Sequence, residues 1–93
     1  MSIIMHLSAT ERAYLERELE RNNETTDVLE DQLTLLYQDQ SQLHDLMRRH
    51  VRGPAPRLMR QLKAVQQKID DAERRLRLAR AVTADTVDKL SHA

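Results

Sequence analysis

Apolar residues recur along most of this chain at alternating spacings of four and three residues. The first series is Leu15, Leu19, Asn22, Thr26, Leu29, Leu33, Leu36, Gln40, Leu43, Met47 and His50. The second is Leu58, Leu62, Val65, Ile69, Ala72, Leu76 and Ala79, after which the pattern blurs into Val82, Thr83, Thr86, Val87 and Leu90. A 3.5-residue repeat places such positions on one stripe of an α-helix, which packs against a partner helix in a coiled coil. The pattern therefore predicts two long helices, each with one buried stripe, here called its seam.

The two series are separated by the segment Arg52-Gly53-Pro54-Ala55-Pro56, which contains the only glycine and both prolines of the chain. Proline lacks an N–H group and disfavours a helical conformation in the residue before it, so Gly53 and Ala55 are expected outside a helix. Pro56 suits the first position of a helix, where the missing N–H costs nothing. The chain should therefore fold back on itself at this segment.

The first helix has a start signal at Ser8-Ala9-Thr10-Glu11, which fits a capping box between the Ser8 and Glu11 side chains and backbone N–H groups. We therefore predict an all-α fold, a long antiparallel two-helix coiled-coil hairpin. Its helices span about 8–52 and 56–90, the turn is 53–55, and the hairpin occupies 8–93. Residues 1–7 are apolar without a helical period, and we expect a flexible or accessory leader there.

The register between the helices has two solutions, in which the numbers of facing residues sum to 105 or to 112. The first sets Leu36 against Ile69, with Asp39 near Lys68 and Glu30 near Glu73. The second brings Glu30 near Arg80 but leaves Leu58 outside the seam. We prefer 105, although exposed charge pairs worth about 0.2–1 kcal/mol each cannot decide the register.

Three polar residues, Asn22, Thr26 and Gln40, interrupt the seam of the first helix. A buried polar group without a partner costs about 1–3 kcal/mol, so each needs an explanation. One explanation is that they control register or lie at a wet end of the hairpin, and the other is that they contact a specific partner.

Further apolar residues lie beside the two seams and widen the apolar face, as is typical of helices in a bundle. A lone hairpin has few layers with which to offset the entropy of ordering its chain, so we expect this surface to be buried as well. We predict a homodimer that forms a four-helix bundle, with a groove for a partner's helix as the alternative. The predicted partner or dimer interface consists of Tyr14, Val28, Leu35, Tyr37, Leu46, Val51, Met59, Leu78, Val82 and Val87.

The composition offers little for catalysis. The chain has no cysteine, and its four histidines lack the i,i+3 or i,i+4 spacing of a helical metal site. No glycine-rich loop is present to hold a phosphate, and no nucleophile has a neighbouring base. We expect no enzyme activity, no metal and no cofactor. No apolar run approaches the ~20 residues that span a bilayer, so we expect a soluble, cytoplasmic protein without a membrane partner.

The net charge is zero, but the charges are segregated along the chain. Residues 1–45 hold ten acids and three arginines, whereas residues 46–69 hold seven basic residues and no acid. The turn therefore lies within a basic tip, which we define as Arg48, Arg49, Arg52, Arg57, Arg60 and Lys63. Such a cluster can bind nucleic acid, but the tip has no aromatic residue on which bases could stack. An acidic protein surface, including that of another copy, is the other acidic partner that would fit.

These features favour a non-catalytic protein–protein interaction module, such as an adaptor, chaperone or small inhibitor. In architecture alone the predicted hairpin resembles the small helical chaperones of bacterial secretion, including those of type III needle subunits, and small phage-encoded inhibitors. No residue motif accompanies this resemblance, and no functional residue is carried over from it. The competing hypothesis is a nucleic-acid-binding hairpin that uses the basic tip.

Overall fold

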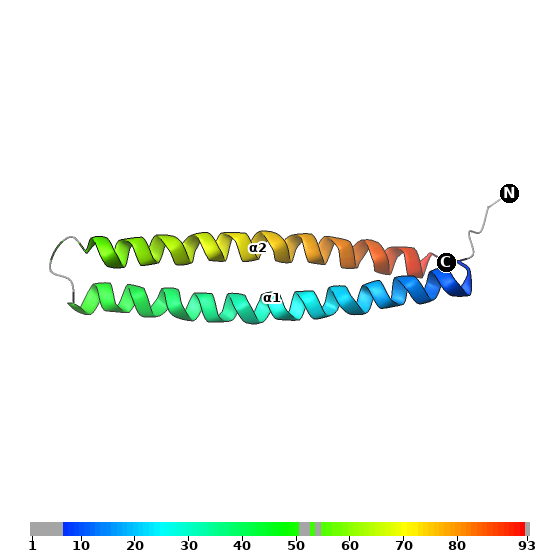
Figure 1. The fold of residues 1–93 in the computed structure, drawn as a ribbon, viewed down its shortest axis with the longest axis horizontal. Helices are drawn as coiled ribbons and strands as arrows, with labels where there is room; N and C mark the ends of the chain where they lie inside the picture. The colour runs from blue at the N-terminus through cyan, green and yellow to red at the C-terminus, as the bar shows by residue number, and fades with distance from the viewer. Residues whose placement is uncertain (1–6, 51–52, 54, 93) are drawn as a thin grey trace.

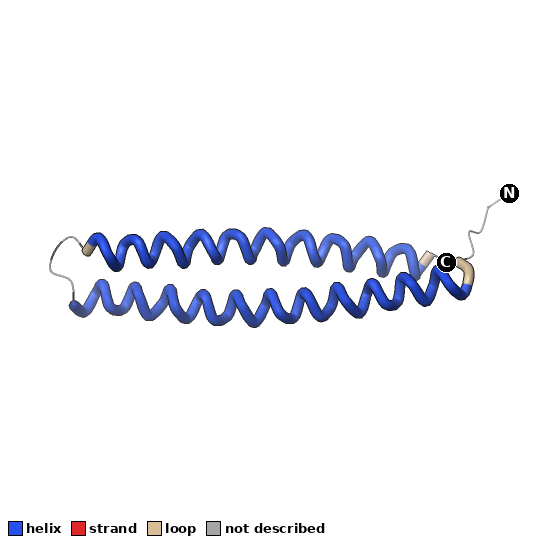
Figure 2. Tube along the Cα trace, viewed as in Figure 1, coloured by secondary structure: helices blue, strands red, loops and turns tan. Residues whose placement is uncertain are grey.

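The computed structural model describes residues 7–50, 53 and 55–92, and it contains two α-helices. Helix α1 spans Ala9–His50 and helix α2 spans Pro56–Ser91. The two helices lie side by side and antiparallel, so the start of α1 and the end of α2 share one end of the molecule (Figure 1). Nearly all described residues are helical, and the molecule measures 73 × 22 × 14 Å (Figure 2). The chain is thus an all-α, two-helix hairpin.

The seams face each other and form the core. Its buried apolar side chains are Leu29, Leu33, Ile69, Ala72 and Leu76, against which Leu36, Val65 and Ala79 pack. Ile69 is the most completely buried of these, with 2% of its surface exposed. Every seam position from residue 15 to 47 and from residue 58 to 79 is buried or half-buried, as are Thr83, Thr86 and Leu90, whereas Val82 and Val87 are exposed. The 3.5-residue repeat therefore identified the contact stripe of both helices correctly.

The helix ends follow the local signals in the sequence. The N–H of Glu11 donates to the Ser8 hydroxyl at 3.1 Å, which is one of the two bonds of the expected capping box. Helix α2 begins at Pro56, and its N-cap residue Ala55 makes no side-chain cap bond. Helix α2 continues to Ser91, one residue beyond the predicted end. The predicted extension of the first helix over residues 51–52 and most of the leader lie outside the described residues.

The register agrees with a backbone alignment near 105. Leu58 is half-buried, whereas a sum of 112 would leave it without a facing residue in α1. The polar bonds between the helices join residues whose numbers sum to 106 or 110, namely Gln40 with Gln66, Tyr37 with Glu73, and Glu30 with Arg80. Side chains lean toward the N-terminus of their own helix. In an antiparallel pair, two long side chains therefore meet when their residue numbers add up to more than the numbers of two backbone positions that lie opposite each other.

One pairing expected from the 105 register is replaced by better ones. Glu30 was expected near Glu73, a like-charge contact. Instead, Arg80 donates to Glu30 at 3.0 Å, and the Tyr37 hydroxyl donates to Glu73. Because the long side chains reach about one turn along the partner helix, each carboxylate finds a donor. The Glu30–Arg80 pair had been expected only for the register of 112.

Candidate protein-interaction surface

The hairpin has two different broad faces, one on each side of the seam. Residues two apart on a helix point about 200° apart, so positions 73 and 75 of α2 lie on opposite sides of the contact with α1. The same relation separates positions 37 and 39 of α1. The surroundings of each apolar residue beside the seam depend on which of these two faces the residue occupies.

Polar bonds between the two helices cross one of the faces. On α2 they come from Gln66, Glu73 and Arg80, which follow one another at seven-residue spacing. The Gln40 amide donates to Gln66 at 2.6 Å, and the other two bonds involve Tyr37 and Glu30 as described above. We call this side the bridged face. Its polar groups largely satisfy one another.

The opposite side carries three adjoining hollows between or beside the helices and is called the groove face. One, of about 360 Å³, is lined by Leu29, Gln32, Leu35, Leu36, Lys68, Asp71, Ala72 and Arg75. A second, toward the turn, is lined by Asp39, Gln42, Leu43, Leu46, Gln61, Ala64, Val65 and Lys68. The third, toward the open end, is lined by Glu24, Thr25, Val28, Leu29, Gln32 and Arg75. Neighbouring hollows share residues, so together they form one groove along the middle of the hairpin.

The predicted interface residues divide unequally between the two faces. All nine described members are exposed in the single hairpin, and Val51 lies outside the described residues. Leu35, Leu46 and Val28 line the hollows of the groove face directly. Seven-residue spacing puts Tyr14 on the same side as Val28, and Leu78 and Val82 on the same side as Asp71 and Arg75. The same rule puts Met59 and Val87 with Tyr37 on the bridged face.

This unequal division was not part of the sequence prediction, which treated the ten residues as one surface. The signal was present in the seven-residue spacing, because positions such as 28 and 35, or 64, 71 and 78, form straight lines along one side of a helix. The lining residues Gln32, Ala64, Lys68, Asp71 and Arg75 were also not predicted as site residues. Six of the nine exposed apolar residues share the groove face, which makes it the stronger candidate for a binding surface.

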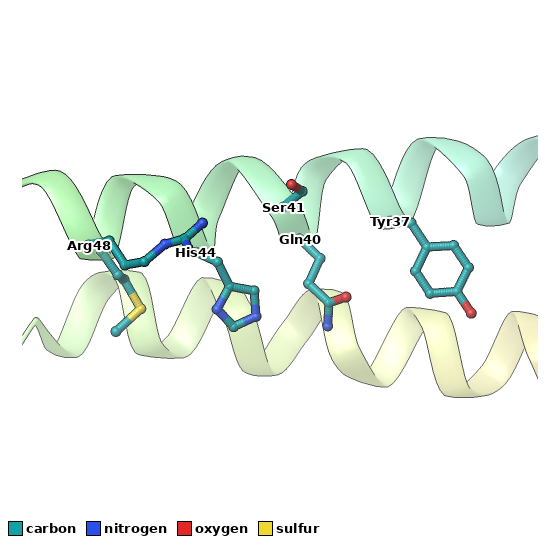
Figure 3. Close-up of a pocket in the computed structure, with 6 residues that line it drawn as sticks. Tyr37, Gln40, Ser41, His44 and Arg48 are labelled. Carbon is teal, nitrogen blue, oxygen red and sulfur yellow. The ribbon is translucent and has the colours of Figure 1, made fainter.

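The bridged face has a hollow of its own near the turn, shown in Figure 3. It is lined by Tyr37, Gln40, Ser41, His44, Met47 and Arg48, all from α1. Figure 3 shows Tyr37, Gln40 and His44 extending from α1 toward α2. Most of these side chains are polar, and two of them already bond to α2. Part of the polar lining of this hollow is therefore already engaged within the hairpin.

Tyr37 is the residue of the bridged face whose acidity is altered. The hydrogen bond from its hydroxyl to Glu73 raises the pKa of Tyr37 above its ordinary value, and the carboxylate charges of Glu73 and Asp70 add to this effect. The Glu73 carboxylate accepts a hydrogen bond from the neutral phenol but would repel a phenolate, so the neutral form of Tyr37 is favoured. The Tyr37 hydroxyl therefore keeps the proton that it donates to Glu73 at neutral pH.

The basic tip is exposed wherever the structure describes it. Arg48 and Arg49 both lie near Asp45, at 3.9 and 3.2 Å. Arg57, Arg60 and Lys63 are exposed and form no ion pair with a described residue, and Arg52 lies outside the described range. The first turn of α2 contains no acidic residue, although the helix dipole favours acids there. The positive charge at the start of α2 is therefore not compensated by its own helix.

The described residues include no group of three or more His, Asp or Glu side chains that could hold a metal ion. Within the same residues, neither helix has an apolar stretch long enough to cross a membrane. No known protein family, curated protein or solved structure matches this chain. The functional argument therefore depends on the surface of the hairpin itself.

Proposed function

We propose that this chain is a non-catalytic protein-interaction module that acts by burying its groove face against another helical surface. The observation that carries the proposal is the concentration of exposed apolar side chains on that face, beside a continuous groove. Contiguous exposed apolar surface with a polar rim marks interaction sites on soluble proteins. Lys68, Asp71 and Arg75 provide such a rim along α2.

The first partner that we propose is a second copy of the chain, giving a homodimer with a four-helix bundle. In one hairpin the seam residues are packed on one side only, and just five apolar side chains of the described residues are buried. Covering the groove face would bury Val28, Leu35 and Leu46 at about 1.5–3 kcal/mol for each side chain that becomes fully buried. An adaptor, a small inhibitor or a bacterial secretion chaperone could present the same face to a different helical protein.

The dimer is tested by sedimentation equilibrium at micromolar concentration. We expect wild-type dimer and a shift toward monomer for Leu35→Glu, because Leu35 is 61% exposed in the hairpin and lines the groove. Gln38→Glu is the matched control, because Gln38 is exposed one turn further along α1, on the side away from α2. It should dimerise like the wild type. Circular dichroism should show equal helicity in all three proteins.

A folded wild-type monomer at these concentrations would contradict the homodimer and leave the groove face to a different protein. Equal dimerisation of Leu35→Glu and wild type would contradict the use of this face. Affinity capture from the source cell would then compare wild type with Leu35→Glu. A protein that is captured by the wild type but not by the variant would support an interaction module whose groove face binds that protein instead of a second copy.

A second candidate function is nucleic-acid binding through the basic tip. It is favoured by Arg57, Arg60 and Lys63, which are exposed and unpaired among the described residues. Binding of random duplex DNA and RNA at ~50 mM salt should fall when Arg57 and Arg60 are both replaced by Gln, because phosphate contacts dominate at low salt. No binding by the wild type under these conditions would exclude this function.

A further inference from the structure

We propose that two copies associate in antiparallel orientation through their groove faces, so that the basic tip of each copy lies over the open end of the other. This inference rests on the proposed homodimer and adds the direction in which the copies run. Two directions are compatible with a face-to-face pair of hairpins. A two-fold axis along the hairpin puts the two tips together, whereas a two-fold axis across it puts each tip beside the other copy's open end.

The distribution of charge along the hairpin separates these two arrangements. Residues 46–63, at the turn, carry six basic residues and no acid. At the open end, residues 9–27 carry six acids and three arginines, while residues 80–92 carry two charges of each sign. A parallel pair would bring two strongly positive ends together. An antiparallel pair brings a positive end to a negative one twice, and complementary charges of this kind select orientation.

A line of residues on α2 shows the same complementarity within the groove face. Arg57, Ala64, Asp71, Leu78 and Asp85 follow one another at seven-residue spacing and share one side of the helix. Ala64 and Asp71 line the hollows. In an antiparallel copy centred on Asp71, Arg57 faces Asp85 of the second copy, and Ala64 faces Leu78 of the second copy. The small alanine leaves room for the exposed leucine.

The centre of this arrangement brings like residues together without an uncompensated charge. Asp71 would face its own counterpart, but each Asp71 already pairs with Arg75 of the same helix at 3.1 Å. On α1 the equivalent line is Arg21, Val28, Leu35, Gln42 and Arg49, and it is centred on Leu35. Leu35 then meets Leu35 of the second copy.

The ends of the α1 line bring Arg21 near Arg49 of the second copy. Each of these arginines has an acid on its own helix: Glu18 lies 3.4 Å from Arg21 and Asp45 lies 3.2 Å from Arg49. Glu18 therefore compensates the charge of Arg21, whereas Asp45, which also lies 3.9 Å from Arg48, compensates Arg49 only in part. The α2 line, by contrast, offers Arg57, which has no ion pair among the described residues, to an acid of the second copy.

The direction is tested by distance measurement between spin labels in the dimer. The chain has no cysteine, so a single Gly53→Cys or Ser91→Cys variant carries one label. A side chain at position 53 meets no atom within 4 Å, and Ser91 is exposed at the end of α2. Because a helix rises 1.5 Å per residue, two labels at position 53 should lie more than about 50 Å apart in the antiparallel dimer.

A mixed dimer of the two labelled variants provides the complementary measurement. Labels at position 53 of one copy and position 91 of the other should be close, within about 30 Å, since a bundle is only a few 10-Å helices wide. Position-53 labels within that shorter range of each other would overturn the antiparallel arrangement while leaving the homodimer standing. A protein that stays monomeric would overturn the homodimer and this inference together.

Charge exchange tests the alignment about Asp71. Arg57→Asp should weaken dimerisation by roughly three- to tenfold at low salt, because the two-fold symmetry converts two attractive contacts into repulsive ones. Adding Asp85→Arg to that variant should restore the wild-type dissociation constant. The pair of changes has to be compared with Asp85→Arg alone, which also loses the 3.1 Å pair between Asp85 and Lys89. A double variant no tighter than either single one would overturn the facing of Arg57 and Asp85.

Discussion

Polar residues in the seam are satisfied mostly by bonds within the hairpin. The Thr26 hydroxyl donates to the Asn22 carbonyl at 2.8 Å, and the Thr86 hydroxyl donates to the Val82 carbonyl at 3.0 Å. Gln40 bonds to Gln66 across the hairpin. Asn22 is different, because its buried Nδ2 atom has no hydrogen-bond partner among the described residues. An unpaired buried amide costs about 1–3 kcal/mol, so Asn22 lowers the stability of the seam at this position.

The raised pKa of Tyr37 gives a pH-dependent contribution to stability. Because the folded state favours the neutral phenol, this contribution is complete below the unfolded pKa of about 10 and is lost as the pH rises through the higher folded pKa. In a Tyr14→Phe background, tyrosinate absorbance reports Tyr37 alone, and its midpoint should exceed 10. Glu73→Gln should lower that midpoint, because it removes the carboxylate that accepts the hydrogen bond.

Glu20→Gln is the control for this titration, since Glu20 is exposed and lies several turns from Tyr37 along α1. It should leave the midpoint unchanged. An unshifted midpoint for Tyr37, or the same midpoint with and without Glu73, would show that the Tyr37–Glu73 bond does not persist in solution.

At the scale of the elements, the sequence was most informative about the seam and the turn. Apolar spacing identified the buried stripe of both helices, because burial of Leu and Ile side chains dominates helix packing. Pro56 marked the start of α2 as expected. The pairing of polar residues could not be predicted, since each exposed pair contributes too little to select a register. The exchange of the expected Glu30–Glu73 contact for two favourable ones illustrates this limit.

Gly53 offers a test of the turn. Gly53 does not have a positive φ, and a Cβ added to it meets open space. Gly53→Ala should therefore increase the free energy of unfolding by about 0.4–1 kcal/mol, because it restricts the unfolded chain without straining the folded one. Urea unfolding at one fixed protein concentration measures this change. A decrease instead would mean that the turn requires glycine.

At the scale of the whole molecule, the proposed dimer links stability to protein concentration. Between residues 7 and 92, the part of the chain that the structure describes apart from the turn, the core holds five buried apolar side chains, so the hairpin gains from any partner that covers its groove face. We expect the melting temperature to rise between ~1 and ~100 µM protein, because association stabilises the folded state by mass action. Leu35→Glu should remove most of this dependence. A melting temperature independent of concentration in the wild type would contradict coupled folding and association.

The charge segregation was visible in the sequence, but its relation to the groove face was not. That relation required the positions of the hollows, because Arg57 and Asp85 share one side of α2 with Ala64 and Asp71, which line them. The functional class is harder still to predict from the sequence. A surface of Leu, Val and Tyr can bind many helical partners, so residue types alone do not identify the one that is used.

The 73 Å length of the hairpin would suit the proposed antiparallel pair to the role of a spacer. Helix α1 begins and helix α2 ends at the same end of each copy (Figure 1). In the antiparallel pair these two open ends point in opposite directions. Two cargoes attached to them would be held at a fixed separation of roughly one hairpin length by stiff helices rather than by a flexible linker. Such a dimer would engage two sites at once only where those sites are spaced to match, which makes its avidity selective for geometry.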